Sequence, residues 1–178
     1  MIVTERLHLR DFEEDDVLDV NAYASDIEVV RGFPFGPSTI EETRSFIAQV
    51  RSLPKAEPRT IYDLAIALKE TDRVIGGCYL KVEGTPEPTG FIVYLLNRQY
   101  WGQGYATETA RALIEFAFVA HGAHRVFTYC DPDNLASARV LEKAGMQREG
   151  LIRESDWSRG AWHDEYLYAI LRREWQRR

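Results

Sequence analysis

A strand-helix-strand pattern in the middle of the sequence most constrains how this chain can fold. "GFIVYLL" (Gly90 to Leu96) is continuously apolar, as expected of an interior strand of a sheet that is covered on both faces. Apolar residues then recur at helical spacing from Ala106 to His121, and Gly122 ends the helix before a second strand-like segment, "HRVFTYC" (His124 to Cys130). Parallel strands need a crossover connection of this kind, which is almost always right-handed. We therefore expect these two strands to be parallel neighbours.

The segments before and after this strand-helix-strand pattern predict a mixed sheet, in which the strands that precede the parallel pair along the chain are antiparallel. A short turn, "KETDR", separates two strand-like segments that we expect to form a hairpin, and "SRG" separates two longer ones near the C-terminus. The further expected strands are Thr4–Phe12, Tyr62–Leu68, Val74–Val82, Gln147–Trp157 and Trp162–Arg173. Further helices are expected after the acidic run Glu13–Asp16, after the Thr39/Glu42 capping box with an end near Pro54, and after Asn134. The prediction is an α/β (α+β) fold with about seven strands and about four helices.

Composition places the chain in a broad class. With 178 residues and 45% hydrophobic content, it can bury one sizeable core, so we expect a single domain over residues 1–178. The N-terminus becomes charged within a few residues and no apolar run reaches the length of a membrane span, so we expect a cytoplasmic protein without a membrane partner. Cys78 and Cys130 lie in strand-like segments without metal-ligand spacing, which predicts buried free thiols in a reducing compartment.

The net negative charge of the chain indicates which classes of partner suit it. A formal net charge of -6 argues against nucleic acid as the main partner and is compatible with a basic substrate. Such a balance also serves solubility alone, so it does not choose a substrate.

Two glycines, Gly102 and Gly104, separate the apolar strand from the helix that follows. A strand that ends in a glycine turn and continues as a helix points several unpaired backbone N–H groups at one place. The donors would come from about Gln103 to Thr107, and each negative charge near the helix start would gain about 0.3–1 kcal/mol from the helix dipole. A diphosphate suits such a site. The alternative is that the two glycines only shape a turn.

Two nucleotide-binding motifs do not fit this turn. In "GQGYAT", Thr107 occupies the place of the third glycine of the dinucleotide-binding fingerprint, and the turn lies in mid-chain, although Asp131 stands near the end of the following strand. No lysine follows the glycines as a P-loop requires. The sequence therefore disfavours nicotinamide binding and nucleotide hydrolysis.

A calcium loop is also disfavoured. Asp131, Asp133 and Asn134 together suggest a calcium loop, but Leu135 and Ala136 stand where an EF-hand loop needs a ligand and a glycine. We therefore expect no metal site.

Two motifs in order along the chain resemble one enzyme family. "QYWGQGYATE" resembles the Q/R-x-x-G-x-G/A coenzyme A pyrophosphate loop of the GNAT N-acetyltransferases. "DPDNLASARVLEKAGMQREG" is similar to the segment that follows this loop in the RimJ/RimL ribosomal-protein N-acetyltransferase branch. The resemblance covers roughly Thr60 to Trp175, and the first two helices more loosely. It implies the GNAT fold, in which the sheet is mostly antiparallel with one splayed parallel pair, and acetyl-CoA as the acetyl donor.

The resemblance also implies which residues would bind the coenzyme. The diphosphate would lie on the turn at Gly102, Gln103, Gly104, Tyr105, Ala106 and Thr107, and the pantetheine arm would pair with the backbone of Tyr94, Leu95 and Leu96. A backbone amide near Leu96 would face the thioester carbonyl, where negative charge grows during attack. Asn134 matches an asparagine that contacts the pantetheine arm, and Ser137 matches a hydroxyl that protonates the departing thiolate. Alternatively, either residue simply caps the helix that follows.

The chain departs from the family pattern at the general base. Many members carry a glutamate on the central strand where this sequence has Phe91. In the RimL-like pattern an acidic residue on the penultimate strand has been considered instead, and its counterpart here is Asp156, with Glu154 and Asp63 as weaker candidates. The alternative for Asp156 is a solvated or ion-paired strand end.

Proton energetics help to choose the acceptor. Only a neutral amine attacks, and at pH 7 deprotonation costs about 1.4 kcal/mol for an α-amine but about 4.6 kcal/mol for a lysine side chain. Weak base assistance therefore favours the N-terminal α-amine of a protein or peptide as acceptor. This amine would attack the thioester directly, without a covalent enzyme intermediate. A small amine such as a polyamine, an aminoglycoside or an amino acid remains an alternative acceptor, and a non-catalytic acyl-CoA-binding module is an alternative of another class. The sequence leaves the oligomeric state open, a homodimer included.

Aromatic residues surround the expected cleft along the sequence. Trp157 and Trp162 could touch the acceptor. The alternative is that they fill the core or an interface, as aromatic residues in a small domain more often do. Phe33 and Phe35 in the "GFPFGP" loop are better candidates, because the resemblance implies that loops between the first helices wall the acceptor side.

Overall fold

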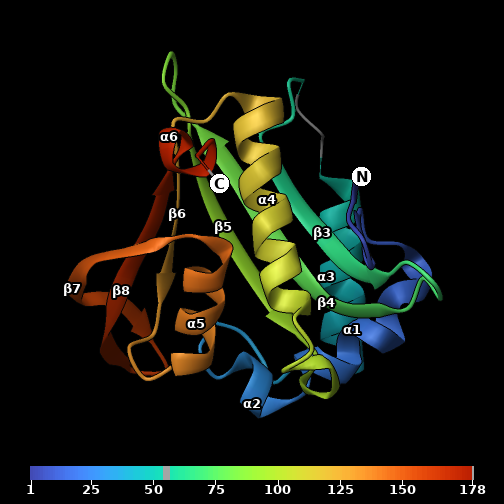
Figure 1. Cartoon of the computed structure of the whole chain (residues 1–178). Coiled ribbons are helices and arrows are strands. Elements are labelled where there is room, and N and C mark those ends of the chain that lie inside the picture. The colour runs from blue at the N-terminus through green and yellow to red at the C-terminus, as the bar shows by residue number, and fades with distance from the viewer. Residues whose placement is uncertain (54–56, 178) are drawn as a thin grey trace.

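The computed structural model describes residues 1–53 and 57–177. In these residues the chain forms one eight-stranded sheet with the order β1-β2-β3-β4-β5-β6-β8-β7 (Figure 1). The strands are β1 (Ile2–Val3), β2 (Leu7–Arg10), β3 (Ile61–Leu68), β4 (Val74–Glu83), β5 (Thr89–Leu96), β6 (Arg125–Cys130), β7 (Gln147–Ser158) and β8 (Ala161–Leu171). Neighbouring strands pair antiparallel except β5 and β6, which are parallel as the sequence predicts. The mixed α/β fold is therefore confirmed.

Helices cover both faces of the sheet. They are α1 (Val17–Ala24), α2 (Ile27–Val30), α3 (Ile40–Ser52), α4 (Tyr105–His121), α5 (Leu135–Ala144) and α6 (Arg172–Trp175), with short 3₁₀ turns η1 (Glu14–Asp16) and η2 (Arg98–Tyr100). Helix α4 crosses one face of the sheet, with α5 beside β6 to β8, while α1 and α3 lie behind the sheet (Figure 1). No helix among the described residues is long and apolar enough to cross a membrane.

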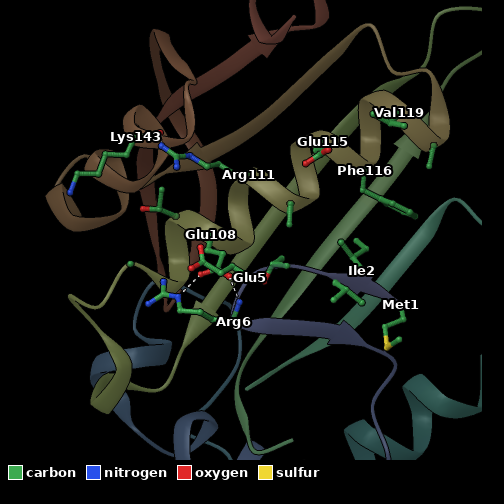
Figure 2. A pocket seen from close by; sticks show the side chains of 16 residues that line it. Met1, Ile2, Glu5, Arg6, Glu108, Arg111, Glu115, Phe116, Val119 and Lys143 are labelled. Carbon is green, nitrogen blue, oxygen red and sulfur yellow. Dashed lines mark hydrogen bonds and ion pairs between the residues drawn. The ribbon is translucent and has the colours of Figure 1, made fainter. Parts of the chain in front are cut away.

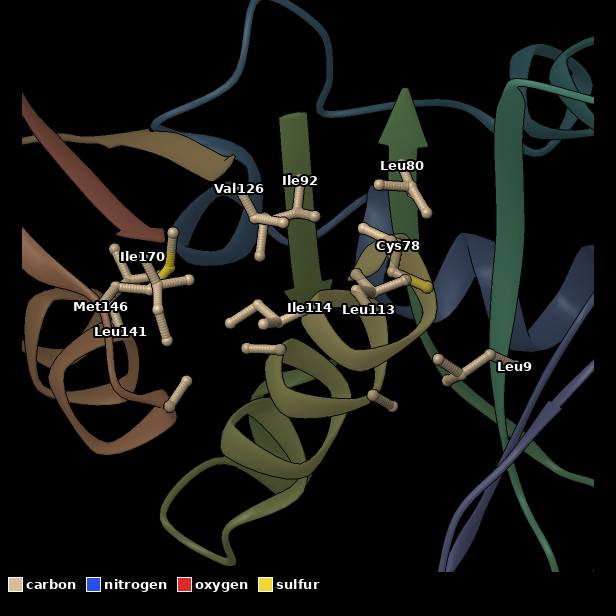
Figure 3. Packing of buried hydrophobic residues seen from close by; sticks show 14 of the residues in the cluster. Leu9, Cys78, Leu80, Ile92, Leu113, Ile114, Val126, Leu141, Met146 and Ile170 are labelled. Atoms are coloured by element: carbon tan, nitrogen blue, oxygen red, sulfur yellow. The ribbon is translucent and has the colours of Figure 1, made fainter. Parts of the chain in front are cut away.

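Two apolar cores hold these layers together. On the α4 side, Leu113 and Ile114 of α4 pack with Ile92 of β5 and Val126 of β6 (Figure 3). On the other side, α1 and α3 pack against β3 and β4 in a smaller cluster. Cys78 and Cys130 are free and buried, as predicted.

Strands β5 and β6 diverge soon after they begin. They pair at Thr89, Gly90 and Phe91 of β5 with Arg125, Val126 and Phe127 of β6. Beyond Phe91, no residue of β5 has a register partner on β6 in the described part of the chain. The result is the splayed parallel pair that the resemblance implied, and we call the space between the diverging ends the fork.

The boundaries differ from the prediction at the first strand. The predicted strand Thr4–Phe12 is shortened to β2, and an additional strand, β1, precedes it. Between them Thr4 N–H donates to the Leu7 carbonyl at 2.9 Å and the Thr4 hydroxyl accepts from Leu7 N–H at 2.9 Å, which makes a turn. The acidic run begins as the 3₁₀ turn η1 before α1 starts. This sheet therefore has one strand more than the sequence predicted.

The last predicted strand is shorter than expected. Arg172 and Arg173 lie in α6, because the Glu174 carboxylate accepts from Leu171 N–H at 2.9 Å and caps a helical turn. The capping box of α3 is present as predicted, with Glu42 N–H donating to the Thr39 hydroxyl at 3.2 Å. Helix α3 ends at Ser52, and the predicted end near Pro54 lies outside the described residues.

The central strand is less buried than its sequence suggests. Gly90, Ile92 and Leu96 of β5 are buried, whereas Phe91 and Val93 are only half buried. Buried side chains of β5 face α4, and the opposite face of β5 is covered by α1 and α3 only toward its Leu95 end. The half-open face is therefore available to other molecules beside the fork.

Candidate active site

Backbone donors on β5 face the fork. Asn97 N–H donates to the Ile75 carbonyl of β4 at 2.8 Å. Backbone groups alternate between the two sides of an extended strand, so the N–H groups of Leu96 and Tyr94 turn away from β4 toward the fork. The Trp101 indole N–H donates to the Leu96 carbonyl at 2.8 Å and holds the strand end in place. The stretch predicted to pair with the pantetheine arm, Tyr94–Leu96, therefore has unpaired strand edge available.

The glycine turn leads from η2 into α4. Gly102 has φ +74° and Gly104 has φ +86°, and this left-handed backbone favours glycine. The turn-shaping role that the sequence left as an alternative is therefore present. The first α-helical bond runs from Glu108 N–H to the Gly104 carbonyl at 3.0 Å. The N–H groups of Tyr105, Ala106 and Thr107 precede it and have no acceptor within the helix, so the turn also offers the donors that an anion needs.

The N-terminal segment forms hydrogen bonds with this turn and with the start of α4. The sequence did not predict these contacts. Glu108 of α4 accepts from the Thr4 hydroxyl at 2.6 Å, from Arg6 N–H at 2.8 Å and from Arg6 Nε at 2.7 Å. Arg6 Nη1 also donates to the Gln103 carbonyl at 3.0 Å. Arg6 and Glu108 line a surface hollow of about 940 Å³, and Figure 2 shows their side chains there. Gly104 and Thr107 line this hollow, whereas Tyr94 and Ser137 do not, so it borders the glycine turn and not the fork.

Two predicted site residues meet on the α5 side of the fork. The Tyr94 hydroxyl of β5 and the Ser137 hydroxyl of α5 lie 3.2 Å apart, and either can donate. Burial raises the pKa of Tyr94 above its ordinary value, although the Ser137 bond lowers it in part. Tyr94 therefore carries its proton at neutral pH. The sequence selected Tyr94 for its backbone and its aromatic ring, so its hydroxyl is a candidate functional group that sequence reasoning missed.

Asn134 occupies the cap of α5. Its side-chain oxygen accepts from Ser137 N–H at 3.0 Å, as in the capping alternative for Asn134. Its predicted contact with the pantetheine arm stays a prediction. The cap also fixes Ser137 in the first turn of α5, where its hydroxyl reaches Tyr94.

The Cys130 thiol lies beside this hydroxyl pair. Burial raises the pKa of Cys130, whereas a hydrogen bond with Ser137 lowers it in part. The thiol also approaches the Asp131 and Asn134 carbonyls at 3.4 and 3.7 Å. A buried thiol with a raised pKa is a poor nucleophile, which agrees with the expectation of direct transfer.

Two carboxylates lie near the end of β6, on the face of the sheet opposite to the Tyr94 and Ser137 hydroxyls. Asp156 is half buried and pairs in register with His163 of β8, so it shares a face with Glu165. Burial raises the pKa of Glu165 above its ordinary value, and the negative charges of Asp156 and Asp131 raise it further. The Ser155 hydroxyl donates a hydrogen bond to the Glu165 carboxylate at 2.9 Å, which lowers this pKa in part. Because Glu165 adjoins Tyr166, the register partner of Cys130, it stands where the fork opens. Sequence reasoning missed Glu165.

The other candidates for a base lie in different settings. Glu154 is exposed at φ +50°, and its N–H donates to the Asp164 carboxylate at 2.8 Å. Asp63 pairs in register with Tyr79 on the face that also holds Phe91, and burial raises its pKa although Arg59 lowers it in part. Neither residue shows the link to the end of β6 that Glu165 has.

The aromatic candidates pair with one another. Trp157 and Trp162 are 57% and 56% exposed, and their rings contact edge to face across the β7–β8 hairpin at 5.3 Å. Phe33 and Phe35 likewise pair at 5.3 Å. Arg159 at the hairpin tip donates to the Val30 carbonyl of α2 at 3.1 Å, which brings the hairpin and the loop after α2 to one side of the molecule.

Comparison with known proteins places this arrangement in a family. The family model described as "Acetyltransferase (GNAT) domain" matches residues 6–147. The chain is 36% identical over 175 residues to the uncharacterized N-acetyltransferase YnaD of Bacillus subtilis, covering 98% of each protein. It superposes on a GNAT acetyltransferase from Bacillus anthracis with a TM-score of 0.82 and 34% identity, covering 96% of this chain and 97% of the other.

A more distant structural neighbour contains the coenzyme. Mycobacterium smegmatis RimJ in complex with CoA-disulfide has a TM-score of 0.80 and 21% identity, covering 95% of this chain and 87% of the other. The unpaired edge of β5 and the free amides at the start of α4 suit such a ligand. The chain belongs to the GNAT acetyltransferase family and is an N-acetyltransferase that uses acetyl-CoA.

Proposed function

We propose that the protein, as a single domain over residues 1–178, transfers the acetyl group of acetyl-CoA to the N-terminal α-amine of a protein or peptide. The observation that carries this proposal is the placement of proton-carrying groups on opposite faces of the fork. The Tyr94 and Ser137 hydroxyls lie on the α5 face, and the Asp156 and Glu165 carboxylates lie on the other face. Direct transfer needs an acid near the leaving sulfur and a base near the attacking amine.

Each residue then has a defined task. Glu165, with Asp156 beside it, accepts the proton that the amine loses as its nitrogen bonds to the acetyl carbon. The Leu96 N–H donates to the thioester oxygen, where negative charge grows. Ser137, or Tyr94 through it, gives a proton to the sulfur as the carbon–sulfur bond breaks. The turn Gly102–Thr107 holds the diphosphate by its backbone N–H groups.

The choice of an α-amine rests on two considerations. The raised pKa of Glu165 brings this base closer to the operating pH, but an α-amine still needs far less help to lose its proton than a lysine side chain. The structural neighbour from Mycobacterium smegmatis carries the name RimJ, which is also the name of the branch that the sequence resembles. At 21% identity this likeness speaks for the fold, so the acceptor is this proposal's own commitment.

The test offers different acceptors to the purified protein at equal concentration. Acetyl-CoA is supplied with Ser- or Ala-starting peptides, with the same peptides blocked at the N-terminus but carrying a lysine, with spermidine, and with an aminoglycoside. Released thiol and product mass are measured. We expect acetylation of the free peptide N-terminus. Faster transfer to spermidine, the aminoglycoside or the lysine side chain would overturn the peptide assignment, and no transfer despite CoA binding would favour a non-catalytic module.

A further inference from the structure

We propose that Arg6 is a positioning residue for the coenzyme diphosphate, because its guanidinium fixes the peptide between Gln103 and Gly104 in one orientation. The inference rests on the proposed binding of the diphosphate to the glycine turn, and it adds a second element, the N-terminal segment, to that site. Arg6 lies 97 residues before Gln103 in the sequence.

Three contacts hold the guanidinium against the turn. Nη1 donates to the Gln103 carbonyl at 3.0 Å, and Nε donates to Glu108 at 2.7 Å. The guanidinium carbon lies 4.3 Å from the centre of the Tyr105 ring. Nη2 lies 3.3 Å from the place where a Cβ on Gly104 would stand. Figure 2 shows Arg6 and Glu108 side by side at the start of α4.

The bond to the carbonyl determines where an amide points. A trans peptide is planar, so its C=O and N–H point in opposite directions. Since the Gln103 carbonyl faces Arg6, the Gly104 N–H faces away from Arg6. Glycine tolerates either orientation of a neighbouring peptide at little cost, and Gly102 and Gly104 lie on both sides of Gln103. Without the arginine, this peptide could turn and withdraw one donor from the anion.

Glu108 in turn fixes the arginine. It accepts from the Thr4 hydroxyl and from both the backbone and the side chain of Arg6. Burial alone would raise the pKa of Glu108, but the bonds from Thr4 and Arg6 lower it below its usual value. The carboxylate is therefore charged at neutral pH. A lysine at position 6 could not meet the carboxylate and the carbonyl together, because it lacks the planar fork of donors.

The test compares two acetyl donors, acetyl-CoA and S-acetylpantetheine, which lacks the diphosphate. For Arg6→Ala we expect the ratio of kcat/KM for acetyl-CoA to kcat/KM for S-acetylpantetheine to fall about tenfold, which is the usual effect of losing a charged hydrogen bond. The change should lie in the KM for acetyl-CoA. Calorimetric titration without an acceptor should show about the same loss of affinity for CoA. Arg6→Lys and Glu108→Gln should give intermediate losses.

The matched control is Arg51→Ala. Arg51 of α3 is 45% exposed and pairs with Glu14 of η1, whereas Arg6 is 41% exposed, so both changes remove one surface cation. Arg51→Ala should leave the donor ratio unchanged. An Arg6→Ala protein that keeps the ratio, or loses activity equally with both donors, overturns the inference. If the unaltered protein itself has no preference for acetyl-CoA, the proposed diphosphate turn is wrong. Should Arg6→Ala fail to fold, Arg6→Lys and Glu108→Gln decide.

Discussion

At the scale of single residues, the hydroxyl pair of Tyr94 and Ser137 is the group most open to test. A general acid contributes about 10²- to 10⁴-fold to a rate, and two hydroxyls at 3.2 Å can substitute for each other in part. We expect Ser137→Ala and Tyr94→Phe each to lower kcat about tenfold, because the remaining hydroxyl still supplies a proton, and the double variant to lose more than the product of the two single losses. Steady-state kinetics with Ser52→Ala, a change at the end of α3, provides the control. Unchanged kcat in the double variant would remove both residues from the chemistry.

The carboxylate pair predicts a change in the pH profile. A base acts only when deprotonated, so the raised pKa of Glu165 places the acidic limb of kcat/KM at higher pH than an ordinary glutamate would. The charge of Asp156 raises that pKa. Asp156→Asn should therefore move the limb to lower pH, and Glu165→Gln should abolish the limb and most of the activity. The opposite result, with loss of activity in Asp156→Asn and little change in Glu165→Gln, would make Asp156 the base.

At the scale of elements, the junction between the glycine turn and α4 determines the conformation of Gly104. Its φ of +86° is a left-handed value that costs a residue with a Cβ about 1–2 kcal/mol. Gly104→Ala should lower the free energy of unfolding by about that amount and weaken CoA binding, as measured by denaturant titration and calorimetry.

Gly32→Ala is the matched control for this change. Gly32 has no positive φ, and nothing lies within 4 Å of an added Cβ. The free energy of unfolding of the Gly32→Ala protein should differ from that of the unaltered protein by less than about 0.5 kcal/mol. Equal effects at both glycines would mean that Gly104 has no special conformational role.

At the scale of the whole molecule, Arg10 ties three parts of the chain together. From β2 it donates to Asp16 at the start of α1 at 2.8 and 2.9 Å, and to Asp72 in the turn between β3 and β4 at 3.1 Å. Removing one partner of a buried ion pair costs about 3–5 kcal/mol. Arg10→Ala should therefore lower the free energy of unfolding by about 3 kcal/mol in denaturant titration. Arg31→Ala, which breaks an exposed pair with Glu28, should cost less than about 1 kcal/mol.

Local signals predicted the parts of the molecule that depend on local rules. Apolar periodicity indicated the strands other than β1 and the four longer helices, and the Gly102/Gly104 turn indicated a helix start that could take an anion. The bracing of this turn could not be predicted, because Arg6 and Glu108 are 102 residues apart and each resembles an ordinary surface charge. Glu165 was missed for a related reason: only the register of β6, β7 and β8 brings it near Asp156 and Asp131.

The fork also has a mechanical consequence. Strands β1 to β5 and strands β6 to β8 form two plates of one sheet, joined in the sheet through the short paired stretch at Thr89–Phe91. We expect a ligand inserted between the plates to change the angle between them. The loop after α2 lies on the first plate and the β7–β8 hairpin on the second, and Arg159 links them. We therefore expect donor binding to adjust the space between the loop after α2 and the hairpin, where we place the acceptor, and initial-rate kinetics to show ordered addition with acetyl-CoA first.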